Sequence, residues 1–318
     1  MPSTATIDAI VPVYGGWEHV EPCLRALLAQ SRPVNVIVVD DCGPDDTADR
    51  VAETFPGVTL LRNAVNRGFA ATCNTGISSG TADIVVLVNS DVVAEPDLMA
   101  SIADALDEAG PEVASVSPLL MGTDGSIDSQ GITADPTCAG FVRYHGAPLE
   151  RQSPEDPPLL GPYGAVAAYR RRALEEVGLL DEGIFMYGEE LDLALRLRAG
   201  GYGSVALDRP GGVHIGGASA GEGTPRQIRL AGFGRGYLLR AWGVLRTRRA
   251  IPALAIEALV CLRRLVLQRD PSALVGRIQG WKAAAGVERP QIPSAGIDAT
   301  IGFRRAIRMR GADYWQTR

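Results

Sequence analysis

The sequence has few cysteines and histidines and no long hydrophobic run. Its five cysteines are widely spaced and form no C-x-x-C pair, so we expect neither a disulfide framework nor a cysteine zinc site. The stretch that comes closest to a bilayer span, residues 251–267, is interrupted by Pro252 and by three charged side chains, so we expect no span there. The first residues contain neither a basic flank nor a long apolar region. We therefore expect no signal peptide and a cytoplasmic location.

Two common phosphate-binding motifs are also missing. The first apolar run continues into residues 13–17, Val-Tyr-Gly-Gly-Trp, and not into G-x-G-x-x-G. The glycine-rich stretch at residues 232–236 follows no predicted strand, and the sequence contains no G-x-x-x-x-G-K-[ST]. A Rossmann dehydrogenase and P-loop chemistry are therefore not supported.

Charge is distributed unevenly along the chain. Residues 1–225 contain 13 basic and 32 acidic side chains, whereas residues 226–318 contain 18 basic and 5 acidic ones. A basic tail of this kind is typical of binding to an anionic membrane surface, lipid phosphate or nucleic acid, or of packing on the acidic part of the same chain. No recognisable nucleic-acid motif accompanies its 17 arginines. A non-enzymatic basic module that binds membrane or nucleic acid is the alternative hypothesis for the function.

The first two hundred residues alternate between apolar runs and helical patterns. Strands are predicted at residues 7–13, 34–39, 58–61, 84–88, 113–117, 164–169 and 204–207. Helices are predicted at residues 18–30, 45–54, 68–79, 95–109, 171–178 and 189–199. The pattern predicts an α/β fold with a mostly parallel sheet and helices on both faces. Residues 121–160 predict an irregular excursion with a short hairpin.

A helical pattern takes over from Thr224. Apolar residues recur there at steps of three and four, first over residues 230–245 and again over 254–265. We therefore predict two parts, residues 1–223 as the catalytic domain and residues 224–318 as a basic helical C-terminal extension.

Polar residues follow three of the predicted strands. The strand ends carry Pro12-Val13-Tyr14, Asp40-Asp41 and Asn89-Ser90-Asp91. Ligands of parallel sheets bind at the carboxyl ends of the strands, so these residues predict a cleft for a metal cation or for ribose and base hydroxyls.

The order of these motifs resembles the inverting glycosyltransferases of family 2, which have the nucleotide-sugar-binding GT-A fold, and in particular their bacterial rhamnosyltransferase and galactofuranosyltransferase branch. The resemblance covers about residues 6–220. The matching stretches are residues 10–14 (IVPVY), 38–41 (VVDD), 66–70 (NRGFA) with Asn74, 89–91 (NSD), 185–192 (FMYGEELD) and 214–219 (HIGGAS).

The resemblance implies a divalent metal, Mn²⁺ or Mg²⁺, at the NSD motif. Asp91 would be the main carboxylate ligand, Asn89 would belong to the donor-binding residues, and His214 would be a metal ligand or a pyrophosphate contact. Mn²⁺ accepts mixed oxygen and nitrogen ligands of this kind. Taken alone, Asn89-Ser90-Asp91 is more typical of a turn than of a metal site, and a lone histidine is more often structural.

The resemblance also places the catalytic base at Glu189-Glu190. Carboxylates at a helix N-terminus have a structural explanation, since they complement the helix dipole. In the family this pair is usually Glu-Asp and removes the proton from the acceptor hydroxyl. Here Glu190 occupies the aspartate position, and the choice between Glu190 and Glu189 stays open. Asp192 is expected to pair with Arg196 one turn on.

The donor would bind at the other strand ends. By resemblance, Asp40 or Asp41 bonds the nucleobase or ribose, and Val13 or Tyr14, after Pro12, packs on the base. Within Asn66-Arg67-Gly68, Arg67 would contact the diphosphate or the sugar. As structural alternatives, the two aspartates cap the next helix and Asn66-Arg67-Gly68 forms a turn.

The resemblance therefore implies an enzyme that transfers a sugar, with inversion, from a nucleotide diphosphate-sugar, with UDP- or dTDP-sugars favoured. The acceptor would be a hydroxyl of a glycan, a lipid-linked compound or a small molecule in cell-wall or polysaccharide biosynthesis. The basic extension would hold the enzyme on the cytoplasmic face of an anionic membrane or would pack on the catalytic domain. No nucleic-acid partner is expected.

Overall fold

The computed structural model describes residues 3–151, 157–216, 223–311 and 314–316. The first half contains β1 (Ile7–Val13), α1 (Trp17–Leu28), β2 (Asn35–Asp40), α2 (Thr47–Thr54), β3 (Thr59–Arg62), α3 (Phe69–Ser79), β4 (Ile84–Val88), β5 (Val92–Ala94) and α4 (Leu98–Ala109). The middle contains β6 (Val113–Gly122), β7 (Ile127–Ser129), β8 (Ile132–Ala134), β9 (Gly140–Val142), β10 (Val166–Arg170), α5 (Arg171–Val177), α6 (Glu189–Ala199) and β11 (Gly203–His214). The C-terminal part contains α7 (Pro225–Ala241), α8 (Ala250–Gln268), α9 (Ser272–Ala283) and α10 (Phe303–Arg308).

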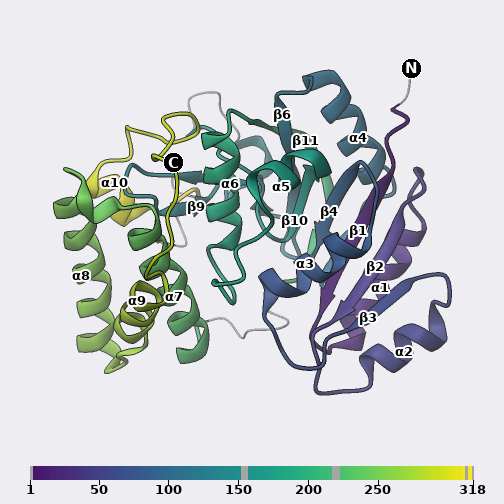
Figure 1. Ribbon diagram of the computed structural model, residues 1–318, viewed down its shortest axis with the longest axis horizontal. Helices are drawn as coiled ribbons and strands as arrows, with labels where there is room; N and C mark the ends of the chain where they lie inside the picture. Colours follow the sequence, from purple (N-terminus) through teal and green to yellow (C-terminus); the bar gives the residue numbers. More distant parts are fainter. Residues whose placement is uncertain (1–2, 152–156, 217–222, 312–313, 317–318) are drawn as a thin grey trace.

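Nine of the strands in the described ranges form one sheet (Figure 1), with β7 beside β6 and the others in the order β3-β2-β1-β4-β10-β6-β11-β5. The parallel arrangement that we expected is present from β3 to β4. Farther along the sheet, β10 is antiparallel to both β4 and β6, and β5 is antiparallel to β11. The half of the sheet beyond β4 is mixed. A parallel strand needs a crossover connection, whereas the chain reaches β10 through the irregular segment at residues 121–160.

Both faces of the sheet are covered, as the continuous apolar runs predict. Successive side chains of a strand point to opposite faces. Val11 of β1 therefore lies in a buried cluster with Leu24 of α1 and Ile102 of α4. The preceding residue, Ile10, lies in a second cluster with Ile77 of α3. This three-layer packing, which confirms the predicted α/β class, fixes the carboxyl ends of β1 and β4 side by side.

Strands β6 and β11 are longer than the sequence pattern indicated. They run together as parallel neighbours as far as Gly122 and His214, through irregularities around Pro210. At its end β11 also pairs with β5, so that His214 lies opposite Val92. This register brings His214 beside the turn that contains Asp91.

The C-terminal helices pack on the rest of the molecule and on one another. Leu195 of α6 shares a buried cluster with Leu238 of α7 and with Trp242, which follows α7. Helices α7 and α9 touch along their backbones: a Cβ on Gly236 would lie 2.0 Å from the carbonyl oxygen of Arg277. Figure 1 shows α8 as the outermost helix, with α9 and α7 between it and the sheet. None of the helices in the described ranges is both long and apolar enough to cross a membrane.

Candidate active site

The carboxyl ends of β1 and β4 open into a cavity of about 690 Å³. Its walls come from these strand ends, from the segment between β6 and β9, from the start of α6 and from the first turn of α7. The sequence-predicted site residues that line it are Pro12, Val13, Tyr14, Asp41, Asn66, Gly68, Asn89, Asp91, Glu189, Glu190 and His214. Residues far apart in the chain therefore meet in one cleft.

His214 lies between two carboxylates. Its Nε2 is 3.3 Å from Oδ1 of Asp91, and its Nδ1 is 3.0 Å from Oδ2 of Asp128. His214 and Asp91 are both buried. Burial alone would lower the pKa of His214, but the hydrogen bonds to Asp128 and Asp91 raise that pKa to about 9. The remaining residues of this motif, Gly217-Ala218-Ser219, lie outside the described residues.

Asp91 and His214 have the chemistry that Mn²⁺ accepts, one carboxylate oxygen and one imidazole nitrogen. Their facing atoms are within 3.3 Å of each other. The described ranges contain no group of three His, Cys, Asp or Glu side chains placed to hold a metal ion. The residues therefore fit a cation that takes its other ligands from the phosphates of the substrate and from water, as small divalent cations commonly do.

Glu189 and Glu190 form the first turn of α6 and line the same cavity. Burial raises the pKa of Glu189 well above its ordinary value, and the neighbouring Glu190 raises it further. Its Oε2 is buried and has no hydrogen-bond partner in the part of the chain that the structure describes. Oε2 of Glu190 instead accepts a hydrogen bond of 3.1 Å from the Gly188 N–H. Burial also raises the pKa of Glu190. The two carboxyl groups therefore differ in environment.

Asp41 holds the loop that precedes α3. Its Oδ1 accepts hydrogen bonds of 2.8 Å from the Asn63 side chain and from the Arg67 N–H, and its Oδ2 accepts one from the Gly68 N–H. The loop then packs on Phe185, whose carbonyl oxygen would lie 2.5 Å from any Cβ at Gly68. This buried carboxylate thus shapes the cleft through the loop that it anchors.

Two predicted donor-binding residues point elsewhere. Oδ1 of Asp40 accepts a hydrogen bond of 3.0 Å from the Gly43 N–H, and Asp40 is not part of the cavity wall. Nη2 of Arg67 lies 2.8 Å from Oε2 of Glu182 and is likewise outside the wall. Both side chains contact neighbouring loops in the structure.

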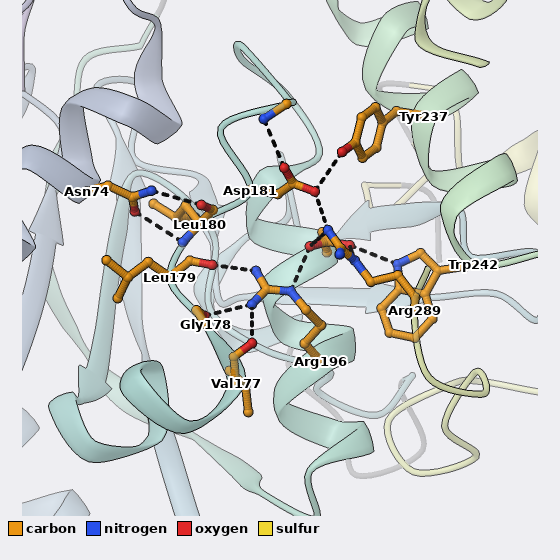
Figure 2. Close-up of polar contacts among 12 residues, drawn as sticks. Asn74, Val177, Gly178, Leu179, Leu180, Asp181, Arg196, Tyr237, Trp242 and Arg289 are labelled. Atoms are coloured by element: carbon orange, nitrogen blue, oxygen red, sulfur yellow. Dashed lines mark hydrogen bonds and ion pairs between the residues drawn. The ribbon is translucent and has the colours of Figure 1, made fainter. Parts of the chain in front are cut away.

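A buried polar cluster fastens α6 to the C-terminal part of the chain (Figure 2). Oδ1 of Asp192 accepts hydrogen bonds of 2.9 Å from Trp242 Nε1 and from Arg289 Nε, and Oδ2 accepts one of 2.8 Å from Arg196, as the i,i+4 spacing predicts. Arg289 also contacts Asp181. Through Arg289, this cluster, centred on Asp192, holds both ends of the segment from Asp181 to Asp192, which contains the Glu189-Glu190 turn.

The same segment is held from the other side. Asn74 of α3 exchanges hydrogen bonds with the backbone of Leu180, at 2.9 and 3.1 Å. Gly234 of α7 approaches so closely that a Cβ there would lie 1.8 Å from the carbonyl oxygen of Tyr187. The glycines at residues 232–236, which do not form a dinucleotide motif, therefore serve helix packing.

Sequence reasoning missed several residues of the cleft, among them Asp128, Arg226 and Gln227. Asp128 belongs to the irregular segment and carries no motif that marks it. Arg226 and Gln227 open α7 and line the cavity. Only the Thr224-Pro225 helix start, which is typical of an N-terminus, could have located these two.

Comparisons with known proteins agree with the resemblance. The model of the family described as Glycosyl transferase family 2 matches residues 8–178, more than half of the chain. The N-acetylglucosaminyl-diphospho-decaprenol L-rhamnosyltransferase of Mycobacterium tuberculosis is 28% identical over 226 residues, which are 64% of this chain and 73% of the relative.

Solved structures show the same fold. The mannosyltransferase PcManGT from Pyrobaculum calidifontis, in complex with GDP-Man and Mn²⁺, superposes with a TM-score of 0.52 at 20% identity and covers 90% of this chain and 88% of its own. GalNAc-T7 with UDP, GalNAc and Mn²⁺ gives a TM-score of 0.58 at 13% identity and covers 90% and 59%. The expected GT-A fold is confirmed, and the enzyme hypothesis is favoured over the non-enzymatic module. The chain belongs to glycosyl transferase family 2 and is a glycosyltransferase that uses a nucleotide-sugar donor.

Proposed function

We propose that this enzyme transfers a sugar, with inversion, from a UDP- or dTDP-sugar to a hydroxyl group of a glycan, a lipid-linked compound or a small molecule. The observation that carries the proposal is that the Asp91–His214 pair and the Glu189-Glu190 pair line one cavity. Displacement of a diphosphate needs stabilisation of the leaving group and a base at the attacking hydroxyl. The M. tuberculosis relative, named for a diphospho-decaprenol acceptor, supports the lipid-linked choice.

The donor would occupy the end of the cleft beside β1 and β4. Val13 and the exposed ring of Tyr14 offer apolar surface for the nucleobase, and the amides of Asn66 and Asn89 offer hydrogen bonds to ribose or phosphate oxygens. Asp41 would act there through the loop that it anchors. Asp91 and His214 would hold Mn²⁺ or Mg²⁺, which when bound neutralises charge on the diphosphate leaving group.

The acceptor would lie against the start of α6. Glu190 takes the proton from the acceptor hydroxyl, whose oxygen forms a bond to the anomeric carbon from the face opposite the diphosphate. The bond from that carbon to the diphosphate oxygen breaks, and the diphosphate leaves with the electron pair. Glu190 is the better base because its Oε2 accepts a hydrogen bond from the Gly188 N–H, whereas Oε2 of Glu189 is buried without a hydrogen-bond partner in the described residues, and burial and Glu190 raise the pKa of Glu189 well above its ordinary value.

We also propose the division into a catalytic part, residues 1–223, and a basic extension, residues 224–318. The extension would attach the enzyme to the cytoplasmic face of an anionic membrane, where a lipid-linked acceptor for cell-wall or polysaccharide synthesis is presented. Its excess of basic side chains supports this attachment.

Thermal unfolding with UDP, dTDP, GDP and CDP, each with and without Mn²⁺, tests the proposal. A ligand at a hundredfold excess over its Kd adds about 2.7 kcal/mol of stability, which is readily measured. We expect a Mn²⁺-dependent rise in Tm with UDP or dTDP, and a smaller one in Asp91→Asn. A rise with GDP alone would move the donor to another base, and no rise with any nucleotide would contradict the proposal.

A further inference from the structure

Helix α8 exposes a continuous apolar face. Ile251 is 80% exposed, Leu262 58% and Val266 64%, values unusual for large aliphatic side chains. The exposed residues of the helix that share this face are Ile251, Leu254, Ala255, Ala258, Leu259, Leu262, Leu265 and Val266. Their spacing, at steps of three and four, places them on one side of the helix. No polar side chain interrupts that side.

The opposite face of α8 is buried. Ala253, Ile256 and Cys261 pack inward, and the single acidic residue of the helix, Glu257, is buried with them. Glu257 pairs with Arg235 of α7 and Arg277 of α9. Helix α8 is therefore firmly attached to the protein through one face and open to solvent through the other. At 1.5 Å per residue, the helix is about 28 Å long.

Exposed arginines flank the apolar face at both ends of the helix. Arg246 and Arg248 precede its N-terminus, and Arg263 and Arg269 lie at its C-terminal end. None of these four takes part in an ion pair with the described residues. The arginines that pack inward, such as Arg235 and Arg277, are in contrast paired with Glu257. The net charge around the exposed face is thus positive.

This distribution of charge decides between two occupants of the apolar face. In a second copy of the chain, antiparallel or parallel pairing of two α8 helices would bring arginines against arginines, without carboxylates to neutralise them. An anionic bilayer offers acyl chains to the aliphatic side chains and phosphates to the arginines.

We propose that the exposed face of α8 is a membrane-docking surface, on which the helix lies in the plane of an anionic bilayer with its aliphatic side chains among the acyl chains and its flanking arginines at the lipid phosphates. The assignment deepens the membrane attachment in the proposed function and rests on it. Vesicle binding is measured without donor or acceptor. A loss of vesicle binding is therefore distinguishable from a loss of sugar transfer.

Co-sedimentation of the full chain with vesicles tests the surface. We expect the wild type to bind vesicles of phosphatidylcholine with phosphatidylglycerol, and to bind phosphatidylcholine alone at least tenfold more weakly. The triple variant Ile251→Ser, Leu262→Ser and Val266→Ser should bind the anionic vesicles about tenfold or more weakly than wild type. Leu28→Ser, at a 51% exposed position on α1, is the matched control and should bind as wild type.

Thermal unfolding verifies that the triple variant is folded. If it is not, Ile251→Ser alone, at the most exposed position, should weaken binding about threefold or more. Three results would overturn the proposal: no binding of the wild type to anionic vesicles, equal binding by wild type and the serine variants, or a wild-type dimer by light scattering that the serine substitutions convert to a monomer. The last result would assign the face to a second copy.

Discussion

Oδ2 of Asp128 lies 3.0 Å from Nδ1 of His214, on the side of the imidazole ring away from Asp91. The contact holds the ring with its other nitrogen, Nε2, toward the carboxylate of Asp91. A carboxylate on the far nitrogen of a metal-binding histidine fixes the orientation of the ring and increases its basicity. Asp128 is therefore placed to act on a bound cation through His214.

Replacement of Asp128 by Asn should weaken Mn²⁺ binding about 10- to 100-fold, because the ring loses its charged partner. Electron paramagnetic resonance of free Mn²⁺, in a titration with nucleoside diphosphate present, measures this affinity directly. Asp107→Asn, at an exposed position on α4, is the control. Equal Mn²⁺ affinity in Asp128→Asn and wild type would reduce the contact to a structural one.

Glu190→Gln should lower kcat about 10²- to 10⁴-fold and leave the donor KM nearly unchanged, because an amide cannot take the acceptor proton. Glu189→Gln should keep kcat within about tenfold of wild type, since an amide resembles the protonated carboxyl that burial favours there. Steady-state kinetics of both variants provides the comparison. The reverse ranking would identify Glu189 as the base.

The pH dependence of transfer should follow the environment of Glu190. Burial raises the pKa of this carboxyl above its ordinary value of 4.5, and only the ionised form is a base. As the pH falls through the raised pKa, the ionised fraction and kcat/KM both fall. We expect the acid limb of the kcat/KM profile above pH 4.5, and a limb at or below that value would argue against Glu190.

Arg289→Met should destabilise the protein by about 3 to 5 kcal/mol, because it removes a partner from the fully buried carboxylate of Asp192. Urea denaturation measures the loss. Arg263→Met, which changes an exposed arginine of α8, should stay within about 0.5 kcal/mol of wild type. Losses of similar size in the two variants would mean that the cluster around Asp192 contributes little.

Acid should weaken the C-terminal helices through Glu257. Burial alone would raise the pKa of this carboxyl, but Arg235 and Arg277 lower it to about 2 from an ordinary 4.5. The stabilisation, about 3 kcal/mol, is therefore present above pH 4.5 and is lost as the pH falls toward 2. Denaturation from pH 6 to 2.5 should show this slope for wild type and a flatter one for Glu257→Gln.

The sequence was sufficient to predict an element of the fold or a residue of the site where several local signals agreed. Strand β4 follows the predicted bounds because both of its faces are buried, which requires a continuous apolar run. Asp91 follows that strand, and Glu189-Glu190 opens a helix that is followed by two glycines. Topology alone then brings these residues toward one edge of the sheet.

Other features depend on contacts that no local pattern encodes. The inward face of α9 is formed by Gly276 and Gly280 against the backbone of α7, so that helix lacks the apolar periodicity that marks α7. Asp128 meets His214 across 86 residues of sequence. Arg67, predicted at the diphosphate, pairs with Glu182 across 115 residues. In each case the partner is determined by the tertiary fold.

The cluster around Asp192 also has a consequence for synthesis on the ribosome. The hydrogen bonds of Asp192 are complete only after Trp242, 50 residues later, and Arg289, 97 residues later, have been synthesised. At about 5 to 20 residues per second, the nascent chain spends about 5 to 20 s with this carboxylate incompletely neutralised. The Glu189-Glu190 turn, the proposed site of the base, therefore gains this support only after Arg289 has been synthesised, and a product that ends before Arg289 would lack it.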